Sequence, residues 1–249
     1  MKRERWYILF GATLVVTSGL LYLLHYAIFH NAHHIYIYLL GDIAFLPLEV
    51  LVVALIVDAL LSSRDRRAAL EKMNMVSGAF FSEVGTALLR DLCRSDPEAD
   101  EKRSLFTHCR TWKEAEFAGI RKRLGDMSFS CESRSGDLEP VRELLLAKRD
   151  FMVGLLENPM LLEHEAFTDL LWAVFHLTEE LASRHALTGL PEADLDHLSG
   201  DMARAYGLLV RQWLDYMRHL ERAYPYLFSL AVRLNPFDPD AEAVIGAGA

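Results

Sequence analysis

The chain has 249 residues, a length that suits one or two domains, and its formal net charge is −9 at pH 7. A net acidic chain argues against broad binding to a phosphate backbone, so we expect no nucleic-acid partner. Hydrophobic residues make up 52% of the chain and are concentrated in residues 1–63, which hold only three of the 26 basic and four of the 35 acidic residues.

The first apolar run extends from Trp6 to Phe29 and contains no Asp, Glu, Lys or Arg. About 20 helical residues cross a bilayer core of roughly 30 Å, so this run is long enough to span a membrane. Basic residues precede it, as in a cleaved signal peptide. However, the run is too long for one and no small-residue cleavage site follows it. We therefore expect an uncleaved span over residues 6–29.

A second apolar run covers residues 35–61, and only a short polar stretch around Asn31 separates the two. Such a short connection predicts a transmembrane helical hairpin. Basic residues flank the hairpin on both sides and are absent from the connection: Lys2, Arg3, Arg5, Arg64, Arg66 and Arg67. By the positive-inside rule, both termini face the cytoplasm.

The second run, "GDIAFLPLEVLVVALIVDALL", carries carboxylates inside an apolar segment. Asp42 and Glu49 are seven residues apart and lie near one face of a helix, and Pro47 between them predicts a hinge. A charge at mid-span costs roughly 3 kcal/mol. Glu49 could be protonated, could hydrogen-bond to Thr17 or Ser18 of the first span, or could line a water-filled path in an oligomer.

Histidines gather at the connection between the two runs. His25 has the right depth to contact Asp42, and His30, His33 and His34 follow it closely. One hypothesis is a metal or proton site outside the cytoplasm. The other is a polar turn made of side chains that tolerate the membrane interface. The sequence leaves metal binding here undecided.

Beyond the second run the helical period continues, which predicts a helical stalk over residues 64–95. Gly41, Gly78 and Gly85 could allow close packing with another helix. Long periodic runs separated by Pro and Gly then predict a cytoplasmic helical bundle over residues 96–237. Residues 238–249 form a small-residue tail, and the fold class is all-α.

The three cysteines are Cys93, Cys109 and Cys131. An odd number with wide spacing and no CxxC pair is not a disulfide framework, so we expect reduced thiols. The stretch "GDMSFSCESRSGD" is rich in Ser and Gly and predicts a loop. Cys131 within it is therefore the thiol that we expect to be most exposed.

One helix of the bundle, residues 161–185, carries a polar stripe of Glu165, Asp169, His176 and Glu180. Di-iron bundles use Glu-x-x-His pairs from two helices. Here no second helix offers a matching pair, so a solvated face is the favoured interpretation. No nucleotide-binding, hydrolase or metalloprotease motif is present, and we predict no catalytic residue and no cofactor.

The segment from Tyr224 to Phe237, "YPYLFSLAVRLNPF", is aromatic and apolar with one Arg. It could lie on the membrane surface, close the core of the bundle, or pack on the stalk of a neighbouring subunit.

Two stretches, "GDIAFLPLEVLVVALIVDALLSSRDRRAALEKMNMVSGAFFSEVG" and "YPYLFSLAVRLNPFD", together resemble a group of bacterial inner-membrane proteins. These have two N-terminal spans and a helical cytoplasmic domain. The resemblance covers about a quarter of the chain and implies a location in the inner membrane. It implies no activity and no functional residues.

Three functions are compatible with these features. The first is a non-enzymatic, self-assembling membrane-anchored module for interaction or signalling, with membrane lipid, further copies of the chain and a cytoplasmic protein as partners. The second is an oligomeric ion or proton channel lined by Asp42 and Glu49. The third, with least support, is a membrane-bound metal-dependent enzyme.

Overall fold

The computed structural model describes residues 2–107, 109–134, 138–158, 161 and 164–244. All regular secondary structure in these residues is helical, which confirms the all-α class. The chain divides into two units, Met1–Arg66 and Arg67–Ala249. Part of the expected tail, residues 245–249, lies outside the described residues.

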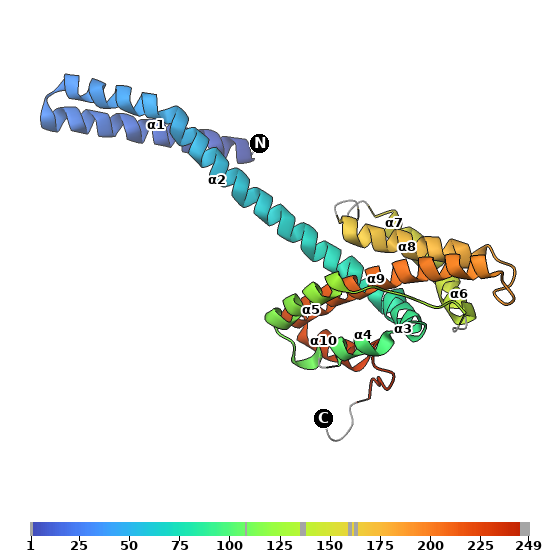
Figure 1. The fold of residues 1–249 in the computed structure, drawn as a ribbon. Helices are drawn as coiled ribbons and strands as arrows, with labels where there is room; N and C mark the ends of the chain where they lie inside the picture. The colour runs from blue at the N-terminus through green and yellow to red at the C-terminus, as the bar shows by residue number, and fades with distance from the viewer. Residues whose placement is uncertain (1, 108, 135–137, 159–160, 162–163, 245–249) are drawn as a thin grey trace. The chain divides into compact units, whose positions relative to one another are not determined.

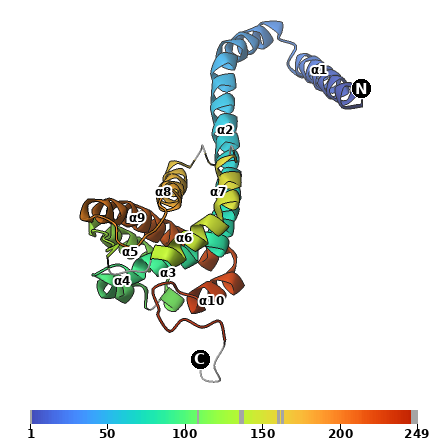
Figure 2. The same cartoon turned by 90° about the vertical axis from the view of Figure 1, so that its right-hand side faces the viewer.

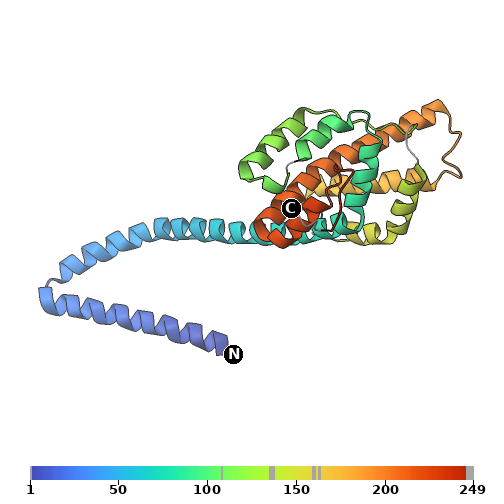
Figure 3. The same cartoon turned by 90° about the horizontal axis from the view of Figure 1, so that it is seen from below.

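The N-terminal unit consists of α1 (Lys2–Phe29) and the first part of α2 (Ala32–Phe80). The turn between them includes His30, whose φ is 50°. Figures 2 and 3 show that the two helices meet only at this connection. From Trp6 to Arg66 the described side chains are exposed, apart from three that are half-buried near the connection. This unit therefore has no core of its own.

Pro47 lies inside α2, and the helix continues through it. A proline has no N–H, so one hydrogen bond of the helix is missing there. The ribbon of α2 curves in this first part (Figure 3). The expected hinge is thus a proline within an unbroken helix and not an interruption between two helices.

The C-terminal unit is built around α9 (Glu192–Ala223). This helix packs against α8 (Glu165–Ala182), α3 (Thr86–Arg94), α5 (Glu114–Asp126) and α10 (Pro225–Arg233). Figure 1 shows α8 and α9 side by side along much of their length. An apolar stripe at helical spacing faces the core from α9: Leu198, Met202, Ala205, Tyr206, Leu209, Val210, Trp213, Leu214, Met217 and Leu220. The period of 3.6 residues explains why these positions share one side.

Four short elements complete this unit. They are α4 (Ala99–Phe106), the 3₁₀ turn η2 (Cys109–Thr111), α6 (Leu138–Ala147) and α7 (Arg149–Leu156). α6 and α7 follow each other directly in the chain but are distinct helices. They are separate because the backbone of Lys148 leaves helical geometry, with φ −107° and ψ 6°.

The expected stalk differs from the structure. The helix passes from α2 through a π-helical turn, η1 (Phe81–Gly85), into α3. Phe80, Phe81, Val84, Leu88, Leu89 and Leu92 along this segment are all fully buried. From Phe80 on, this segment is therefore part of the core and not a free-standing stalk.

The glycines of this segment are used inside the unit. A Cβ on Gly85 would lie 2.6 Å from the Phe81 ring and 2.7 Å from the Phe80 ring, and one on Gly78 would lie 3.6 Å from Tyr216. Gly78 therefore packs against another helix, α9 of the same chain, as expected, whereas Gly85 makes room for the two rings of its own segment. A Cβ on Gly41 would meet nothing within 4 Å.

The loop that follows α5 contradicts one prediction. Cys131 is buried, and its Sγ lies 3.7 Å from the carbonyl oxygen of Leu92. The loop crosses the core surface because Glu132 N–H donates to Ser95 O at 2.7 Å and Ser133 Oγ donates to Leu195 O at 2.8 Å. A composition rich in Ser and Gly predicted the loop correctly but not the burial of its thiol. Cys93 and Cys109 are also free and buried.

The C-terminal segment closes one end of the core. Asn235 donates to Phe106 O at 3.1 Å, and the rings of Phe106 and Phe237 stack with centroids 4.1 Å apart. In contrast, Tyr226 and Leu227 on α10 are exposed. The segment therefore contributes to the core at Phe228 and Phe237 and leaves an apolar outer face.

Candidate functional site

The carboxylates of the second apolar run lie apart from their predicted partners. Asp42 and Glu49 are exposed, and neither forms a hydrogen bond or ion pair with a residue that the structure describes. Thr17 donates to Thr13 O of its own helix at 2.8 Å, and Ser18 is exposed. Because α1 and α2 meet only at their connection, the structure does not bring Thr17 or Ser18 to Glu49.

His25 lies near the histidine-rich turn and not against Asp42. Its ring is 4.8 Å from that of Phe29 and 6.3 Å, nearly parallel, from that of His34. Its Nε2 is buried without a hydrogen-bond partner among the described residues. The turn histidines bring no third ligand atom together in the described part of the chain, so the structure gives a metal site there no support.

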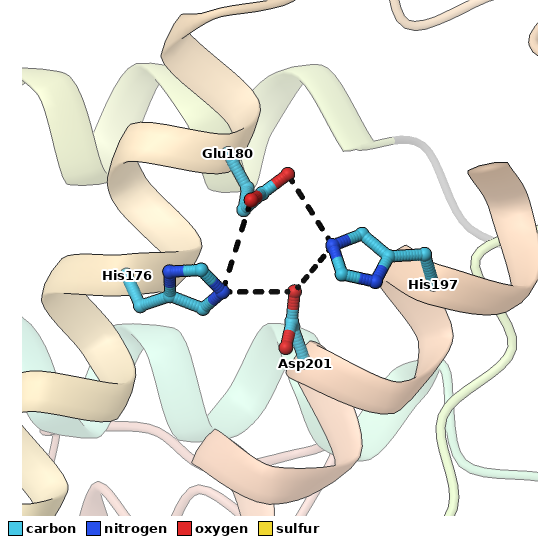
Figure 4. A group of neighbouring side chains, drawn as sticks. All are labelled: His176, Glu180, His197 and Asp201. Carbon is cyan, nitrogen blue, oxygen red and sulfur yellow. Dashed lines mark ion pairs between the residues drawn. The ribbon is translucent and has the colours of Figure 1, made fainter.

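A different set of side chains does converge, between α8 and α9. His176 and Glu180 come from α8, and His197 and Asp201 come from α9 (Figure 4). Each pair has a spacing of four residues, which places both members on one face of their helix. One ligand atom from each residue lies within 4.8 Å of all the others.

The contacts within this cluster cross from one helix to the other. Asp201 Oδ2 lies 3.3 Å from Nε2 of His176 and 3.3 Å from Nε2 of His197. Glu180 lies 3.5 Å from His197 and 3.8 Å from His176, measured from its two carboxylate oxygens. The cluster thus alternates imidazole and carboxylate around a common centre.

Burial differs sharply across the cluster. The side chain of Asp201 is 4% exposed, whereas those of His176 and His197 are 47% and 53% exposed. Asp201 Oδ2 is buried and accepts no hydrogen bond within the described structure. The cluster therefore has a buried, unsatisfied oxygen at its base and two imidazoles that solvent can reach.

Two arginines hold the carboxylates in place. Arg184 donates to Glu180 Oε2 at 2.8 Å and forms a two-pronged contact with Asp194 at 2.6 and 2.9 Å. The hydrogen bond from Arg184 keeps the pKa of Glu180 below its ordinary value. Arg204 lies 3.3 Å from Oδ1 of Asp201, which leaves Oδ2 directed into the cluster.

Sequence reasoning treated His176 and Glu180 as part of a solvated stripe and did not pair them with His197. The overlooked signal is a His followed four residues later by a carboxylate, repeated on two helices joined by a short turn. In an antiparallel hairpin each His then faces the carboxylate of the other helix. Glu165 and Asp169, from the same predicted stripe, are exposed and lie outside the cluster.

The C-terminal unit also contains an open cleft of about 940 Å³. Residues 70–77 of α2, the first turn of α8 and the end of α9 line it. Two of its arginines are in ion pairs, Arg121 with Asp215 and Arg218 with Glu114. Among the described residues, the metal-binding side-chain types of the cleft form no group of three like the one between α8 and α9, so that cluster is the better candidate for a metal site.

These features define an all-helical protein in which two unburied apolar helices precede a helical domain with a His and carboxylate cluster. Residues 2–61 match the family model "MJ1433, N-terminal helical domain", and residues 69–233 match "Uncharacterized protein MJ1433, C-terminal helical domain". The chain belongs to this family.

One relative is "Uncharacterized protein MJ1433" of Methanocaldococcus jannaschii. It is 41% identical over 238 residues, which cover 96% of each chain. No solved structure matches. Because this relative is archaeal, the bacterial origin expected from the resemblance stays a prediction.

Proposed function

We propose that the protein is a membrane-anchored helical module for interaction or signalling. The observation that carries this proposal is the exposure of two long apolar helices. Trp6–Phe29 and the helix that starts at Ala32 are each long and apolar enough to cross a membrane, and their apolar windows are 0% buried. A core helix of a soluble domain would instead be buried in its own chain. Lipid is the medium that suits so much apolar surface.

The distribution of basic residues supports the orientation in the proposal. Arg64 and Arg66 follow the second run, and no Lys or Arg lies in the connection. Both termini and the C-terminal domain are then cytoplasmic. In a bacterium, the membrane concerned would be the inner membrane.

Self-assembly is part of the proposal because of Asp42 and Glu49. A carboxylate inside hydrocarbon needs a partner or a proton, and neither residue has a partner among the described side chains of its own chain. Further copies of the span supply polar groups at the same depth. An assembly of identical chains is therefore the arrangement we favour.

We assign the contact with a cytoplasmic protein partner to the C-terminal domain. Large apolar side chains are exposed at Trp172 on α8 and at Tyr226, Leu227 and Leu230 on α10. Exposed apolar groups of this size are typical of contact surfaces. These side chains would contact the partner while the hairpin holds the domain at the membrane.

The test is membrane topology by thiol labelling. The three native cysteines are buried, so an introduced cysteine can be read against a low background. With a membrane-impermeant maleimide on intact cells, we expect Asn31→Cys to react and Ser63→Cys to react only after permeabilisation. Release of the protein from membranes by alkaline carbonate, or equal labelling of both positions, would contradict the proposal.

A further inference from the structure

We propose that His176, Glu180, His197 and Asp201 form a binding site for one divalent transition-metal ion of the Zn²⁺ type. The proposal concerns the C-terminal domain alone and does not depend on the orientation of the protein in a membrane. The cluster joins α8 to α9, and the alternation of ligands around its centre is visible in Figure 4.

The spacing of the ligand atoms fits a tetrahedral ion. With metal–ligand bonds of roughly 2.0–2.1 Å, the corners of a tetrahedron lie about 3.3 Å apart. The two contacts of Asp201 Oδ2 are each 3.3 Å, and Glu180 Oε1, the oxygen that Arg184 does not hold, lies 3.8 Å from Nε2 of His176. One ligand atom from each residue lies within 4.8 Å of the others, so side-chain rotation that brings Glu180 closer would place all four around one ion.

The buried oxygen of Asp201 is the observation that favours a metal site over a set of ordinary ion pairs. Both imidazole nitrogens lie 3.3 Å from Oδ2, yet neither is aligned to donate a hydrogen bond to it. A buried carboxylate oxygen without a partner is costly. An ion at the centre of the cluster would satisfy this oxygen and accept the lone pairs of both imidazoles.

The ligand types select the class of metal. Two imidazole nitrogens and two carboxylate oxygens suit Zn²⁺, Co²⁺ and similar ions. Ca²⁺ and Mg²⁺ prefer oxygen ligands throughout. The exposure of His176 and His197 leaves the centre open to solvent on one side, so the ion would be exchangeable.

Two arginines next to the carboxylate ligands support a metal-binding role for the cluster. Carboxylates that bind metal are usually oriented by further hydrogen bonds. Arg184 holds Oε2 of Glu180, and Arg204 lies beside Oδ1 of Asp201. Each arginine thus engages one carboxylate oxygen and leaves the other available, Oε1 on Glu180 and Oδ2 on Asp201.

The experiment uses the full-length protein in mild detergent, stripped of metal by a chelator. We expect one Zn²⁺ per chain by isothermal titration calorimetry, and Co²⁺ absorption bands of tetrahedral intensity that Zn²⁺ removes. Asp201→Asn and His197→Gln should each weaken Zn²⁺ binding by about 100-fold, at the upper end of the loss caused by changes around a metal site. Binding of Zn²⁺ should also raise the melting temperature, because only the folded chain presents the site.

Two controls make the result specific. His185→Gln changes an exposed histidine in the turn between α8 and α9 and should leave Zn²⁺ binding unchanged. The combined His30, His33 and His34→Gln variant removes the turn histidines and should also bind normally. If Asp201→Asn fails to fold, His176→Gln removes another ligand of the cluster at a half-exposed position, and it should also weaken Zn²⁺ binding.

Zn²⁺ binding that survives in the cluster variants, or that disappears in the turn variant, would overturn the proposal. So would a wild-type protein that binds no Zn²⁺ while its circular dichroism shows it folded. In that case the cluster would be a set of ion pairs only.

Discussion

Lys102 and Asp96 form an ion pair at 2.9 Å, and both side chains are 0% exposed. Asp96 also accepts from Glu98 N–H at 2.9 Å and from Ser130 Oγ at 3.3 Å. Buried charges are tolerated when they are paired and hydrogen-bonded. The pair ties α4 to the segment before it and to the loop that follows α5.

Breaking this pair should be strongly destabilising. We expect Lys102→Met to lower the free energy of unfolding by about 3–5 kcal/mol, because it leaves a buried carboxylate without its cation. Urea unfolding can be followed by the fluorescence of the buried Trp112 and Trp213. The double variant Lys102→Met/Asp96→Asn should lose less than the sum of the single variants; additive losses would show that the two residues act independently.

The three cysteine thiols give a second prediction for individual residues. Burial raises the pKa of Cys109 to about 11 and raises the pKa values of Cys93 and Cys131 as well. Only the thiolate reacts, so iodoacetamide at pH 8 should leave all three unmodified in the native protein. In denaturant all three should react, as mass spectrometry would show. Fast native labelling of Cys131 alone would mean that its loop opens readily.

At the scale of elements, the π turn η1 lies where two aromatic rings enter the core. Phe80 and Phe81 are both fully buried, and their rings meet edge to face at 5.4 Å. Gly85 lies one turn further on and leaves room for both rings. The close approach of the rings is the reason that this position favours glycine.

A methyl group at position 85 should therefore disrupt packing. We expect Gly85→Ala to cost about 1–3 kcal/mol, the usual cost of overpacking a core. Gly119→Ala on α5 is the matched control, because its Cβ would meet nothing within 4 Å. That change should stabilise the protein by about 0.5–1 kcal/mol, since alanine favours a helix over glycine. Equal effects of the two changes in thermal unfolding would contradict the packing argument.

The helices were largely predictable from sequence, and the site was not. Phe167, Leu170 and Val174 recur at helical spacing and are buried as that pattern predicts, because periodicity reports which side of a helix faces a core. The cluster forms because α8 and α9 are neighbours and are aligned so that His176 and Glu180 lie opposite His197 and Asp201. The periodicity of a sequence indicates neither which helices are neighbours nor how they are aligned. The burial of Cys131 depends on where a loop crosses the core, which composition does not specify.

For the whole molecule, the role of Glu49 decides between assembly and conduction. In liposomes that contain the purified protein, we expect no ion or proton flux from the wild type or from Glu49→Gln. Glutamine keeps the hydrogen-bonding groups of the span, so the oligomer seen by cross-linking should persist. Glu49→Leu removes these groups and should weaken the oligomer, at roughly 1 kcal/mol per lost contact between helices.

Flux that changes in rate or selectivity with Glu49→Gln would instead favour an oligomeric channel lined by Asp42 and Glu49. A wild-type protein that is monomeric in mild detergent would count against both arrangements, since one hairpin cannot enclose a pore.

The length of α9 has a consequence for how distant parts of the C-terminal unit influence one another. Its 32 residues form one rod of about 48 Å, with His197 and Asp201 near its start and the cleft-lining residues 212–224 at its end. A small tilt imposed at one end is transmitted along a stiff rod as a displacement at the other. The cluster and one wall of the cleft thus lie on the same unbroken helix, so a tilt of α9 at the cluster would also move that wall.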